Sequence, residues 1–536
     1  MQAPINDGIL SSPYPPVELP QNDSLYQHIK KRFLEFGDQP ALVRNGEPLS
    51  FSVVLSLMER YAVGFQQYGV SLGSRVCLNV SNSAESLLAA YSLCCLGAAV
   101  VLAKPSLTER EVSYQVADSD VDFVLTEHEN AEKILNIHKK RPFKALFSMD
   151  HSPGFVCVQD FECKDGGHFQ EPQIEDTKSH IVLYTYTSGT TGQPKGVEIS
   201  MYAFIASVEL NRAIQFFKEG DVVLGWNPVT HACGFLLGMT AFVSGAMVVP
   251  SKAGLSPKEF VEIVDKHQVT TLCTFPTAFR KLVFQLEEGV VPSLKRIIIT
   301  GSACTGDLYR RIIQVFQPES LRNTYGMSES IGFTSIMAPN TIGYRSIGHP
   351  MPMVQFKIVD NATGLQLGPG EVGEMTFRAP HTMRGYYKQP EATAEVLDEE
   401  RWLRSGDAGY YDSSGRLYIV ERLKDMIKCL DQQVVPSEIE DLLVKHPLVQ
   451  EAAVVGIDHP ELGEAPTAFV VTKPSDRGCI TEEELVRLVA EQTAFHKHLH
   501  GGVVFVNHIP KTDTGKYQKR KLRQRHLHLL KASNEP

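Results

Sequence analysis

The residues whose types and spacing most clearly indicate a chemical role form one loop, Thr187 to Gly196. Three glycines alternate there with hydroxyl side chains around a single lysine, Lys195. Glycine lets a backbone turn tightly and approach a ligand closely, and the exposed N–H groups then form an anion-binding concavity. The hydroxyl groups and the lysine add donors and positive charge, so the loop predicts a polyphosphate site. The residues expected to line it are Thr187, Ser188, Gly189, Thr190, Thr191, Gly192 and Lys195.

This loop is not a Walker A motif, because that motif needs Ser or Thr directly after its lysine and Gly196 stands there instead. A Ser- and Gly-rich surface turn is the alternative interpretation. The order T-S-G-T-T-G-x-P-K-G resembles the signature loop of the adenylate-forming superfamily, which comprises acyl- and aryl-CoA ligases, beetle luciferases and peptide-synthetase adenylation domains. The resemblance is strongest to luciferase-like and 4-coumarate-type ligases, and it continues through further motifs in the family's order.

A second segment, Asn323 to Ser330, matches the superfamily signature Y-G-x-[ST]-E. The resemblance implies that Tyr325 offers a flat face to adenine and that Ser328 donates to an α-phosphate oxygen. It also implies that Glu329 is an oxygen ligand for the Mg²⁺ that accompanies ATP. Considered alone, the segment fits equally well the start of a helix with Ser328 as its N-cap.

Two further residues lie in motifs for the nucleotide ribose. A carboxylate can accept hydrogen bonds from both ribose hydroxyls, and Asp407 in a Ser-Gly-Asp sequence is the candidate. Taken alone, Asp407 is more typical of an aspartate in a turn. By resemblance, Arg422 contacts the ribose and Lys424 is the hinge between two domains.

Near the C-terminus, Ile509 to Lys516 resembles the superfamily motif P-K-T-x-[ST]-G-K. The match implies that Lys516 is the adenylation lysine, whose charge bridges the carboxylate nucleophile and the α-phosphate as negative charge concentrates there. The alternative interpretation is that Lys516 is an ordinary surface lysine of a basic tail. The resemblance also places Lys428 and Gln433 on the face that serves the second half-reaction.

The acid substrate is expected beside Pro228 to His231, which matches the family's segment next to the substrate carboxylate. His231 is therefore a catalytic candidate, and a satisfied core histidine is the alternative. The residues matched to the pocket are small or apolar, which favours a hydrophobic acid over a charged metabolite. They are Gly234, Phe235, Gly301, Ser302, Ala303, Gly326, Met327, Ile331 and Gly332.

One position departs from the superfamily pattern. After Lys428 the family reads aromatic-Lys-Gly-aromatic-Gln-Val, whereas this chain has Leu430 and Asp431 in place of the lysine and glycine. A side chain at the glycine position narrows the path of a pantetheine arm, and a carboxylate disfavours a nearby thiolate. We expect either slow thioester formation or an unusual acceptor. A small shift of the loop with normal use of CoA is the alternative.

Two kinds of architecture must position these segments. From about residue 24 to 300, helical stretches alternate with short β-branched runs, a pattern typical of βαβ units and mostly parallel sheets. Ligands in such folds bind beyond the carboxyl ends of strands, where the loop of residues 187–196 is expected. From about residue 340 to 421, short strands between Gly, Pro and Asp turns predict a small antiparallel barrel or sheet.

After Arg422 the pattern changes to a compact α+β module. We therefore expect an α/β protein in which residues 1–423 form a large N-terminal domain of two doubly wound sheets plus a small β-barrel, which binds ATP and the acid. Residues 424–536 are expected to form a mobile α+β C-terminal catalytic domain. Two domains also suit a chain of 536 residues, which is too long for one core.

The composition excludes several classes of protein. A net charge of −10 argues against a protein that coats nucleic acid or anionic membrane. Ten cysteines without a C-x-x-C pair are typical of reduced thiols in a cytosolic-type compartment, and neither a signal peptide nor a C-terminal peroxisomal tripeptide is found, so a cytoplasmic location is expected. The uncharged runs 86–103 and 232–251 are nearly long enough to span a bilayer, but a glycine interrupts each, which favours a buried helix followed by a core strand.

The resemblance implies an acid–CoA ligase that activates a hydrophobic carboxylic acid, fatty or aryl, with ATP and Mg²⁺ and transfers the acyl group from acyl-AMP to CoA. The acid, ATP and CoA are its expected partners, without nucleic acid. Two rivals share the first step: a luciferase-like monooxygenase that oxidises its own adenylate, and a ligase that loads a carrier protein. A catalytically silent nucleotide-binding regulator is the non-enzymatic alternative. The identity of the acid and the oligomeric state stay open.

Overall fold

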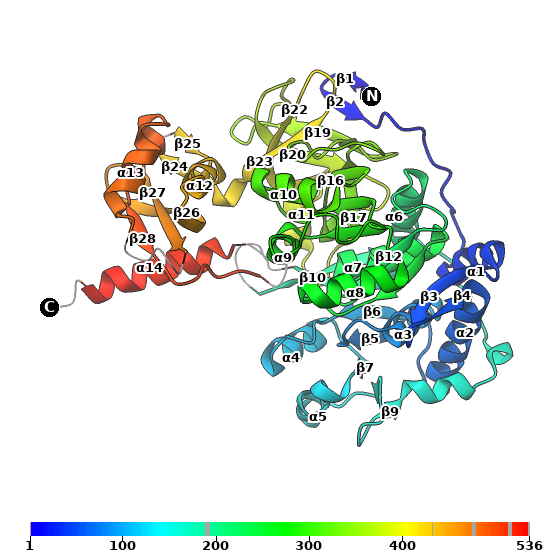
Figure 1. The fold of residues 1–536 in the computed structure, drawn as a ribbon. Coiled ribbons are helices and arrows are strands. Elements are labelled where there is room, and N and C mark those ends of the chain that lie inside the picture. Colours follow the sequence, from blue (N-terminus) through cyan, green and yellow to red (C-terminus); the bar gives the residue numbers. More distant parts are fainter. Residues whose placement is uncertain (1, 188–192, 431, 474–478, 513–516, 534–536) are drawn as a thin grey trace.

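The computed structural model of the chain describes residues 2–187, 193–430, 432–473, 479–512 and 517–533. Figure 1 shows a large body that contains the N-terminal three quarters of the chain and a smaller lobe at its side that contains the C-terminal elements. The large body is built on three sheets and the lobe on a fourth.

The first sheet has eight strands among the described residues, and its neighbouring strands from β10 to β9 run parallel. Two further strands are antiparallel to their neighbours: β11, the hairpin partner of β10, and β21 at the edge of the sheet. In spatial order the strands are β21 (Gly385–Tyr386), β11 (Lys195–Ser200), β10 (Ile181–Thr187), β6 (Ala99–Leu102), β5 (Arg75–Leu78), β7 (Phe123–Thr126), β8 (Ala145–Ser148) and β9 (Val156–Cys157).

The second sheet has nine strands within the described ranges, with a parallel centre and antiparallel edges. In spatial order they are β18 (His349–Pro350), β17 (Gly332–Ile336), β16 (Ser320–Met327), β15 (Arg296–Ile299), β14 (Thr271–Thr274), β12 (Val222–Gly225), β13 (Met247–Pro250), β3 (Pro40–Arg44) and β4 (Glu47–Ser50).

Helices cover both faces of these two sheets. The space between the sheets is a shared core, to which five helices contribute buried side chains such as Phe33, Tyr91 and Phe235. Two helices cover the outer face of the first sheet, and three cover the outer face of the second. The inner helices are α1 (Leu25–Phe36), α2 (Phe51–Gln67), α3 (Ala84–Cys95), α6 (Met201–Ala213) and α7 (Ala232–Val243); the outer ones are α4 (Glu109–Asp118), α5 (Ala131–Lys140), α8 (Pro257–His267), α9 (Pro276–Val283) and α10 (Gly306–Phe316). This layering confirms the predicted doubly wound α/β class.

Local sequence explains where the elements begin and end. Helix α1 begins at a capping box in which Ser24 Oγ accepts from the N–H of Gln27 and the Gln27 side chain accepts from the N–H of Ser24. The two long uncharged runs fold as expected, because left-handed glycines, Gly97 (φ 67°) and Gly245 (φ 76°), separate helices α3 and α7 from strands β6 and β13. No helix within the described ranges is long and apolar enough to cross a membrane.

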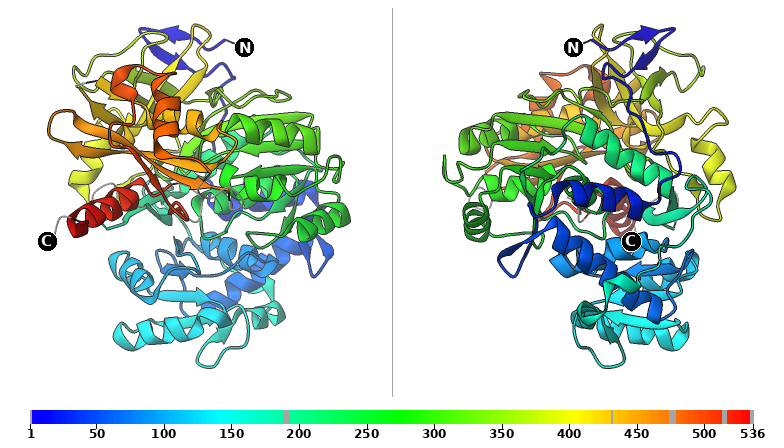
Figure 2. Two further views of the ribbon diagram at one scale, coloured as in Figure 1. Left: turned by 60° about the vertical axis from the view of Figure 1, so that its left-hand side comes forward. Right: turned by 90° about the vertical axis from the view of Figure 1, so that its right-hand side faces the viewer.

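The third sheet is antiparallel and, as far as the structure describes the chain, open rather than closed into a barrel. Its strands are β1 (Ile5–Asn6), β2 (Ile9–Ser11), β19 (Gln355–Val359), β20 (Gly373–Arg378), β22 (Leu403–Tyr411) and β23 (Leu417–Arg422), and helix α11 (Pro390–Val396) precedes β22. The small β-barrel expected in the large domain is thus an open sheet among the described residues, because no pairing joins β1 to β23. Both views of Figure 2 place the N-terminal hairpin beside these strands, where Leu10 pairs with Phe356.

The C-terminal lobe is an α+β domain with its own core, as predicted. The hydrophobic clusters of this lobe contain only residues from Ile427 onward. Its described sheet orders the strands β25 (Gln432–Val434), β24 (Ile427–Cys429), β27 (Gly463–Thr472) and β26 (Val449–His459), with β28 (Val503–Phe505) parallel to β27. Its helices are α12 (Pro436–Val444), α13 (Glu482–Ala490) and the basic terminal helix α14 (Lys519–Ser533).

Candidate active site

The predicted phosphate loop connects the two strands of a hairpin. Strand β10 ends at Thr187, strand β11 begins at Lys195, and these two residues are paired in register. Because β10 runs parallel to β6, the loop follows the carboxyl end of a parallel-sheet strand, as expected. The loop residues Ser188, Gly189, Thr190, Thr191 and Gly192 lie outside the described part of the chain.

Lys195, Tyr386 and Glu329 form one contiguous group beside this loop. The Lys195 Nζ lies 4.9 Å from the ring centroid of Tyr386. The hydroxyl of Tyr386 donates to Glu329 Oε1 at 2.9 Å. Tyr386 was missed by sequence reasoning, and the only signal was a pair of tyrosines after Gly385. The structure shows that it links the lysine of one motif to the glutamate of another.

Glu329 lies in a short 3₁₀ helix, Ser328–Ser330, directly after strand β16, so the segment does not start an α-helix. The residue is 8% exposed, and its backbone carbonyl accepts from the N–H of Met383 at 2.7 Å. Burial raises the pKa of the Glu329 carboxyl above its usual value. A buried carboxylate held by the neutral hydroxyl of Tyr386 fits a cation, because a cation would offset the cost of burying its charge.

Tyr325 near the end of β16, Asp407 in the middle of β22 and Arg422 at the end of β23 form a second polar group. The hydroxyl of Tyr325 donates to Asp407 Oδ2 at 2.6 Å, and Arg422 Nε lies 3.3 Å from Asp407 Oδ1. Asp407 and Arg422 are paired across strands β22 and β23. Asp407 therefore lies within a strand and not in the turn that its Ser-Gly-Asp context suggests, because the strand continues through Gly406 at φ 70°.

Both ribose candidates are thus held in place before any ligand binds. Burial raises the pKa of the Tyr325 phenol well above its usual value, so the hydroxyl keeps its proton and donates to Asp407. Each oxygen of a carboxylate has two acceptor positions, so Asp407 retains acceptor capacity beside its two protein partners. Asp407 and Tyr325 are both nearly enclosed, at 7% and 8% exposed.

The residues matched to the acid pocket divide into two sets. His231 is the N-cap of helix α7, where its Nδ1 accepts from the N–H of Cys233 at 3.2 Å, and its ring lies edge-on to Phe275 at 5.6 Å. Gly301 packs on the same phenylalanine at φ 84°, and an added Cβ would lie 2.4 Å from the Phe275 ring. Ser302 is half-buried and Ala303 is exposed in the same loop. His231, Phe275 and Gly301 therefore lie together.

The second set surrounds tightly packed backbone. Gly326 and Gly332 face each other, and a Cβ on Gly326 would lie 2.0 Å from the carbonyl oxygen of Gly332. Met327 is half-buried, whereas Phe235 and Ile331 are fully buried in the core. A cavity of about 30 Å³ between α7 and β12 is lined by Gly234 but not by Phe235, Ile331 or Gly332. This volume is on the scale of a water molecule, so the cavity as it stands is too small for an organic acid.

The C-terminal candidates lie on a tight hairpin. Lys428 on β24 and Gln433 on β25 are paired in register and both are exposed. Leu430 occupies the left-handed region at φ 53°, and its N–H donates to the carbonyl of Leu462 at 2.8 Å. Asp431, beside it, and Lys516, the predicted adenylation lysine, lie outside the described residues.

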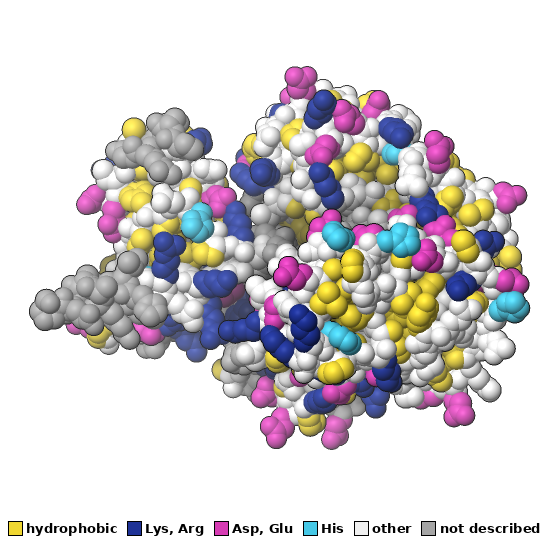
Figure 3. All heavy atoms as spheres, turned by 90° about the horizontal axis from the view of Figure 1, so that it is seen from below, with side chains coloured by type: hydrophobic (Ala, Val, Ile, Leu, Met, Phe, Trp, Pro, Cys, Tyr) yellow, Lys and Arg dark blue, Asp and Glu magenta, His cyan; other side chains and the backbone are white. Residues whose placement is uncertain are grey.

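Polar contacts cross the segment that joins the two domains. Lys424 lies in a short 3₁₀ helix, Leu423–Asp425, directly after β23. The Lys519 Nζ on α14 lies 2.9 Å from Glu440 and 3.6 Å from Glu421, and the N–H of Ser437 donates to Glu421 at 3.2 Å. Although the chain is acidic overall, Lys and Arg side chains gather beside the junction of the two lobes on the face shown in Figure 3.

Comparison with known proteins gives consistent matches along the chain. A family model of AMP-binding enzymes matches residues 29–387, and the model of the AMP-binding enzyme C-terminal domain matches residues 438–516. The chain is 32% identical over 533 residues to 4-coumarate–CoA ligase 5 of Oryza sativa subsp. japonica, which covers 96% of this chain and 97% of the relative. It is 30% identical to 4-coumarate–CoA ligase of Pinus taeda, with 96% and 97% covered.

Solved structures show the same fold. ATP-bound MatB from Rhodopseudomonas palustris has a TM-score of 0.85 at 22% identity and covers 94% of this chain and 99% of that one. The anthranilate CoA ligase AuaEII in complex with anthranoyl-AMP also has a TM-score of 0.85 at 22% identity, with 96% and 99% covered.

Proposed function

The chain belongs to the AMP-binding enzyme family and is an ATP-dependent, AMP-forming ligase of the acyl- and aryl-CoA ligase type, and from that premise we propose that it activates a hydrophobic carboxylic acid and transfers the acyl group to CoA. In the first half-reaction a carboxylate oxygen of the acid attacks the α-phosphorus of ATP and pyrophosphate leaves. In the second, the CoA thiol attacks the acyl carbon and AMP leaves with the electron pair of the broken bond.

The observation that carries the proposal is the pair of polar groups described above. Lys195, Tyr386 and Glu329 form one group, and Tyr325, Asp407 and Arg422 form the other. The charges of Asp407 and Arg422 act on the carboxyl of Glu329, so the two groups share one electrostatic environment. One cationic side chain, one buried carboxylate and one prearranged hydrogen-bonding pair match the phosphates, metal and ribose of a nucleotide.

We assign the nucleotide contacts accordingly. Residues 187–192 and Lys195 would hold the phosphates, Ser328 an α-phosphate oxygen, and Asp407 and Arg422 the ribose. Tyr325 and the pocket-floor residues Gly301, Ser302, Ala303, Gly326 and Met327 would border the adenosine and the acyl group. Mg²⁺, held by Glu329, would neutralise phosphate charge when bound.

We assign the reacting ends of the site to Lys516, His231, Lys428 and Gln433. Lys516 would bridge the carboxylate and the α-phosphate in the first step. His231, fixed at the start of α7 and packed on Phe275, would border the substrate carboxylate. After a movement of residues 424–536 about Lys424, Lys428 and Gln433 would face the acyl-AMP, and their pairing across β24 and β25 supports a common role.

The acid is proposed to be fatty or aryl because the matched pocket is apolar. Gly234 lines the small cavity between α7 and β12. The other lining residues of this cavity are mostly apolar, with Asn82 and Asn227 as polar exceptions. An apolar wall selects for hydrophobic substrates, since it offers a charged substrate no compensation for lost hydration.

The experiment that tests this function is a screen of fatty, aryl and branched acids for AMP formation, with and without CoA. We expect AMP release that depends on a hydrophobic acid and rises with CoA. AMP release with acid that CoA does not increase would favour a carrier protein as acceptor, and oxygen consumption by the adenylate would favour the luciferase-like rival. Absence of pyrophosphate release across the panel would contradict catalysis and favour a nucleotide-binding regulator.

A further inference from the structure

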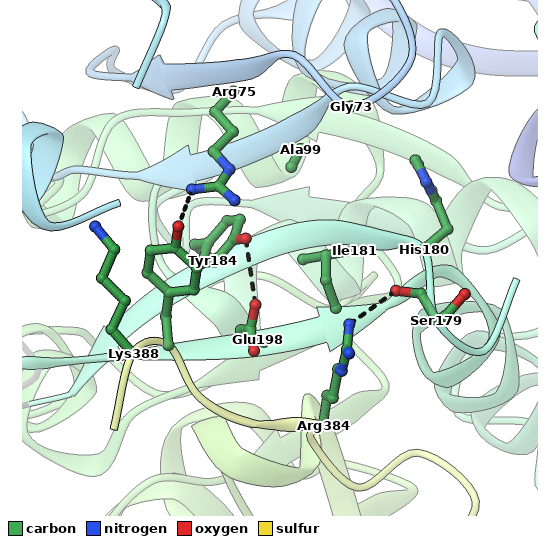
Figure 4. Close-up of a pocket in the computed structure, with 11 residues that line it drawn as sticks. Gly73, Arg75, Ala99, Ser179, His180, Ile181, Tyr184, Glu198, Arg384 and Lys388 are labelled. Atoms are coloured by element: carbon green, nitrogen blue, oxygen red, sulfur yellow. Dashed lines mark hydrogen bonds between the residues drawn. The ribbon is translucent and has the colours of Figure 1, made fainter. Parts of the chain in front are cut away.

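A larger cavity of about 500 Å³ lies on the opposite side of the sheet edge from the candidate active site. Figure 4 shows that side chains from several elements point into it: Arg75 from the start of β5, Tyr184 from β10, Glu198 from β11, and Arg384 and Lys388 from the segment around β21. Its walls also include the starts of β6 and β10. The cavity therefore lies toward the amino ends of the parallel strands, whereas the phosphate loop follows the carboxyl end of β10.

Strand alternation separates the cavity from the active site. Successive side chains of a strand point to opposite faces. On β11, Lys195 contacts Tyr386 whereas Glu198 lines the cavity. On β21, Tyr386 contacts Glu329, whereas Tyr387, directly after this strand, lines the cavity. Strands β10 and β11 thus carry candidate site residues on one face and part of the cavity wall on the other, and the residues that flank β21 complete the wall.

Cationic side chains outnumber carboxylates around this cavity. Arg75, Arg384 and Lys388 line it. Asp120 compensates part of their charge, because it lies 2.8 Å from the Lys388 Nζ and 3.4 Å from Arg75 Nη1. Glu198 is the second carboxyl group at the cavity. Three cationic side chains against two carboxylates leave an excess of one positive charge, and burial, which raises the pKa of Glu198, favours its neutral form. Burial lowers the pKa of His180, which therefore adds no charge near neutral pH.

Arg75 is held rigidly on one wall. Its Nη1 donates to the hydroxyl of Tyr387 at 2.6 Å, and its guanidinium lies over the rings of Tyr387 and Tyr184 at 4.6 and 5.2 Å. The Tyr387 hydroxyl in turn donates to Asp120 at 2.7 Å. A cation fixed between two aromatic rings costs little further ordering when a ligand binds.

Arg384 faces the cavity from the opposite wall (Figure 4). It is exposed, and within the described part of the chain its side chain makes one hydrogen bond, from Nη1 to the carbonyl of Ser179 at 3.2 Å. A guanidinium has five N–H donors, so most of those on Arg384 are available to a ligand. Two guanidinium groups on facing walls are suited to planar, bidentate recognition of phosphate.

We propose that this cavity is a binding site for a small phosphate monoester, held by Arg384 and Arg75 with Lys388 at the rim. The excess of positive charge attracts an anionic head group, guanidinium donors on facing walls suit its oxygens, and the volume accommodates an organic portion beside it. The site is a separate one and does not depend on the adenylating function.

Isothermal titration calorimetry of the full-length protein with glycerol 3-phosphate tests the proposal. We expect saturable binding of one equivalent, and none with glycerol, which lacks the phosphate. Arg384→Gln should weaken the Kd by about tenfold or more, the equivalent of one charge-assisted hydrogen bond, and Arg384→Lys should weaken it less. Arg384 is exposed, so the variants should keep the wild-type circular dichroism spectrum.

Two control variants separate this cavity from other cationic sites. Arg487→Gln removes an arginine of comparable exposure from helix α13 and should leave the Kd unchanged. Lys195→Ala removes the cation of the phosphate loop and should also leave it unchanged. Lack of saturable binding to the wild type, a Kd that Arg384→Gln does not alter, or binding that Lys195→Ala abolishes would each overturn the proposal.

Discussion

At the scale of single residues, Asp407 contacts both Tyr325 and Arg422, and its substitution tests the ribose assignment most directly. It accepts from Tyr325 at 2.6 Å, lies 3.3 Å from Arg422 and is buried. We predict that Asp407→Ala raises the KM for ATP about 10- to 150-fold, the equivalent of 1.5–3 kcal/mol for hydrogen bonds to a charged acceptor. The ranking of acid substrates should not change, because Asp407 is assigned to the ribose.

The measurement is the KM for ATP with two different acids. Asp360→Ala is the matched control, because Asp360 is a turn aspartate of the same sheet that accepts only from nearby residues of its own turn among the described contacts. An unchanged KM for ATP, or a changed order of acids, would count against the ribose assignment.

Glu329 carries a prediction about stability. Burial raises its folded-state pKa above the usual 4.5. A raised pKa means that the native state binds this proton more tightly than the unfolded state does, so the contribution is present at low pH and is lost as pH rises through the raised pKa. Glu329→Gln removes the cost of the buried charge and keeps an acceptor for Tyr386. Without Mg²⁺, we therefore predict a Tm a few degrees higher than wild type at neutral pH.

Thermal unfolding at several pH values measures this effect. The gain in Tm should shrink as pH falls below the usual glutamate value. We also expect Mg²⁺ to raise the Tm of the wild type and not that of the variant. A Tm gain that is independent of pH would mean that the charge of Glu329 is not its cause.

The individual site residues were predictable to different degrees. Motif order placed Lys195, Glu329, Tyr325, Asp407 and Arg422, and the structure brings these into the two contacting groups. Motif order did not predict Tyr386, because a tyrosine has no distinctive sequence signal. The pairing of β21 with β11 places it between a lysine and a glutamate. Nor did motif order predict that Asp407 and Tyr325 bond to each other, since strands β16 and β22 belong to different sheets.

At the scale of elements, the β24–β25 hairpin bears on the second half-reaction. A non-glycine residue in the left-handed region costs about 1–2 kcal/mol, and Leu430 adopts φ 53° there. We predict that Asp431→Gly speeds the consumption of acyl-AMP by CoA while leaving acyl-AMP formation unchanged, because it widens the path of the pantetheine arm and removes a negative charge.

Single-turnover kinetics of the two half-reactions, in the wild type and in the variant, measure this prediction. Glu461→Gly is the control, because it removes an exposed acidic residue from the turn between β26 and β27 of the same domain. Fast CoA transfer in the wild type with no gain in the glycine variant would show that the hairpin accommodates CoA as it stands.

Helix α14 and the interdomain segment meet at Lys519. Its side chain is 11% exposed and lies between Glu440 and Glu421. Burial raises the pKa of Glu440, and Lys519 opposes that rise. We predict that Lys519→Met destabilises the C-terminal domain by about 3–5 kcal/mol, because it leaves buried carboxyl groups without their cation.

Chemical unfolding monitored in the C-terminal domain tests this, and the double variant Lys519→Met with Glu440→Gln provides the control. The double variant should recover most of the loss, since it removes the uncompensated charge. Equal loss in both variants would show that packing, and not charge, is the contribution of Lys519.

The order and type of the elements were largely predictable, and their partners were not. Short continuous runs of β-branched residues between helical stretches predicted strands such as β5, β12 and β15, because strands of a parallel sheet are buried on both faces. The two-residue strands β9, β18 and β21 were not predicted, because such short segments have no periodicity. The pairing of β2 with β19 joins the two ends of the large domain, and local sequence contains no information about so distant a partner.

At the scale of the whole molecule, the chain forms two lobes with separate hydrophobic cores, and the proposed nucleotide site lies on the larger one. The domain boundary at residue 424 and the movement of the C-terminal domain about Lys424 stay predictions. The doubly wound sheets were predictable in class. Whether the antiparallel segment closes into a barrel depends on edge pairings, and the structure shows an open order.

The central claim is that this site forms acyl-AMP with the C-terminal lysine Lys516 as its electrostatic catalyst. The most direct measurement is the single-turnover rate of acyl-AMP formation from a hydrophobic acid and ATP, in the wild type and in Lys516→Ala, with ATP affinity measured alongside. The account predicts a rate that falls by roughly 10²–10³ while ATP binding and the fold stay nearly intact. Formation of acyl-AMP by the variant at close to the wild-type rate would contradict it.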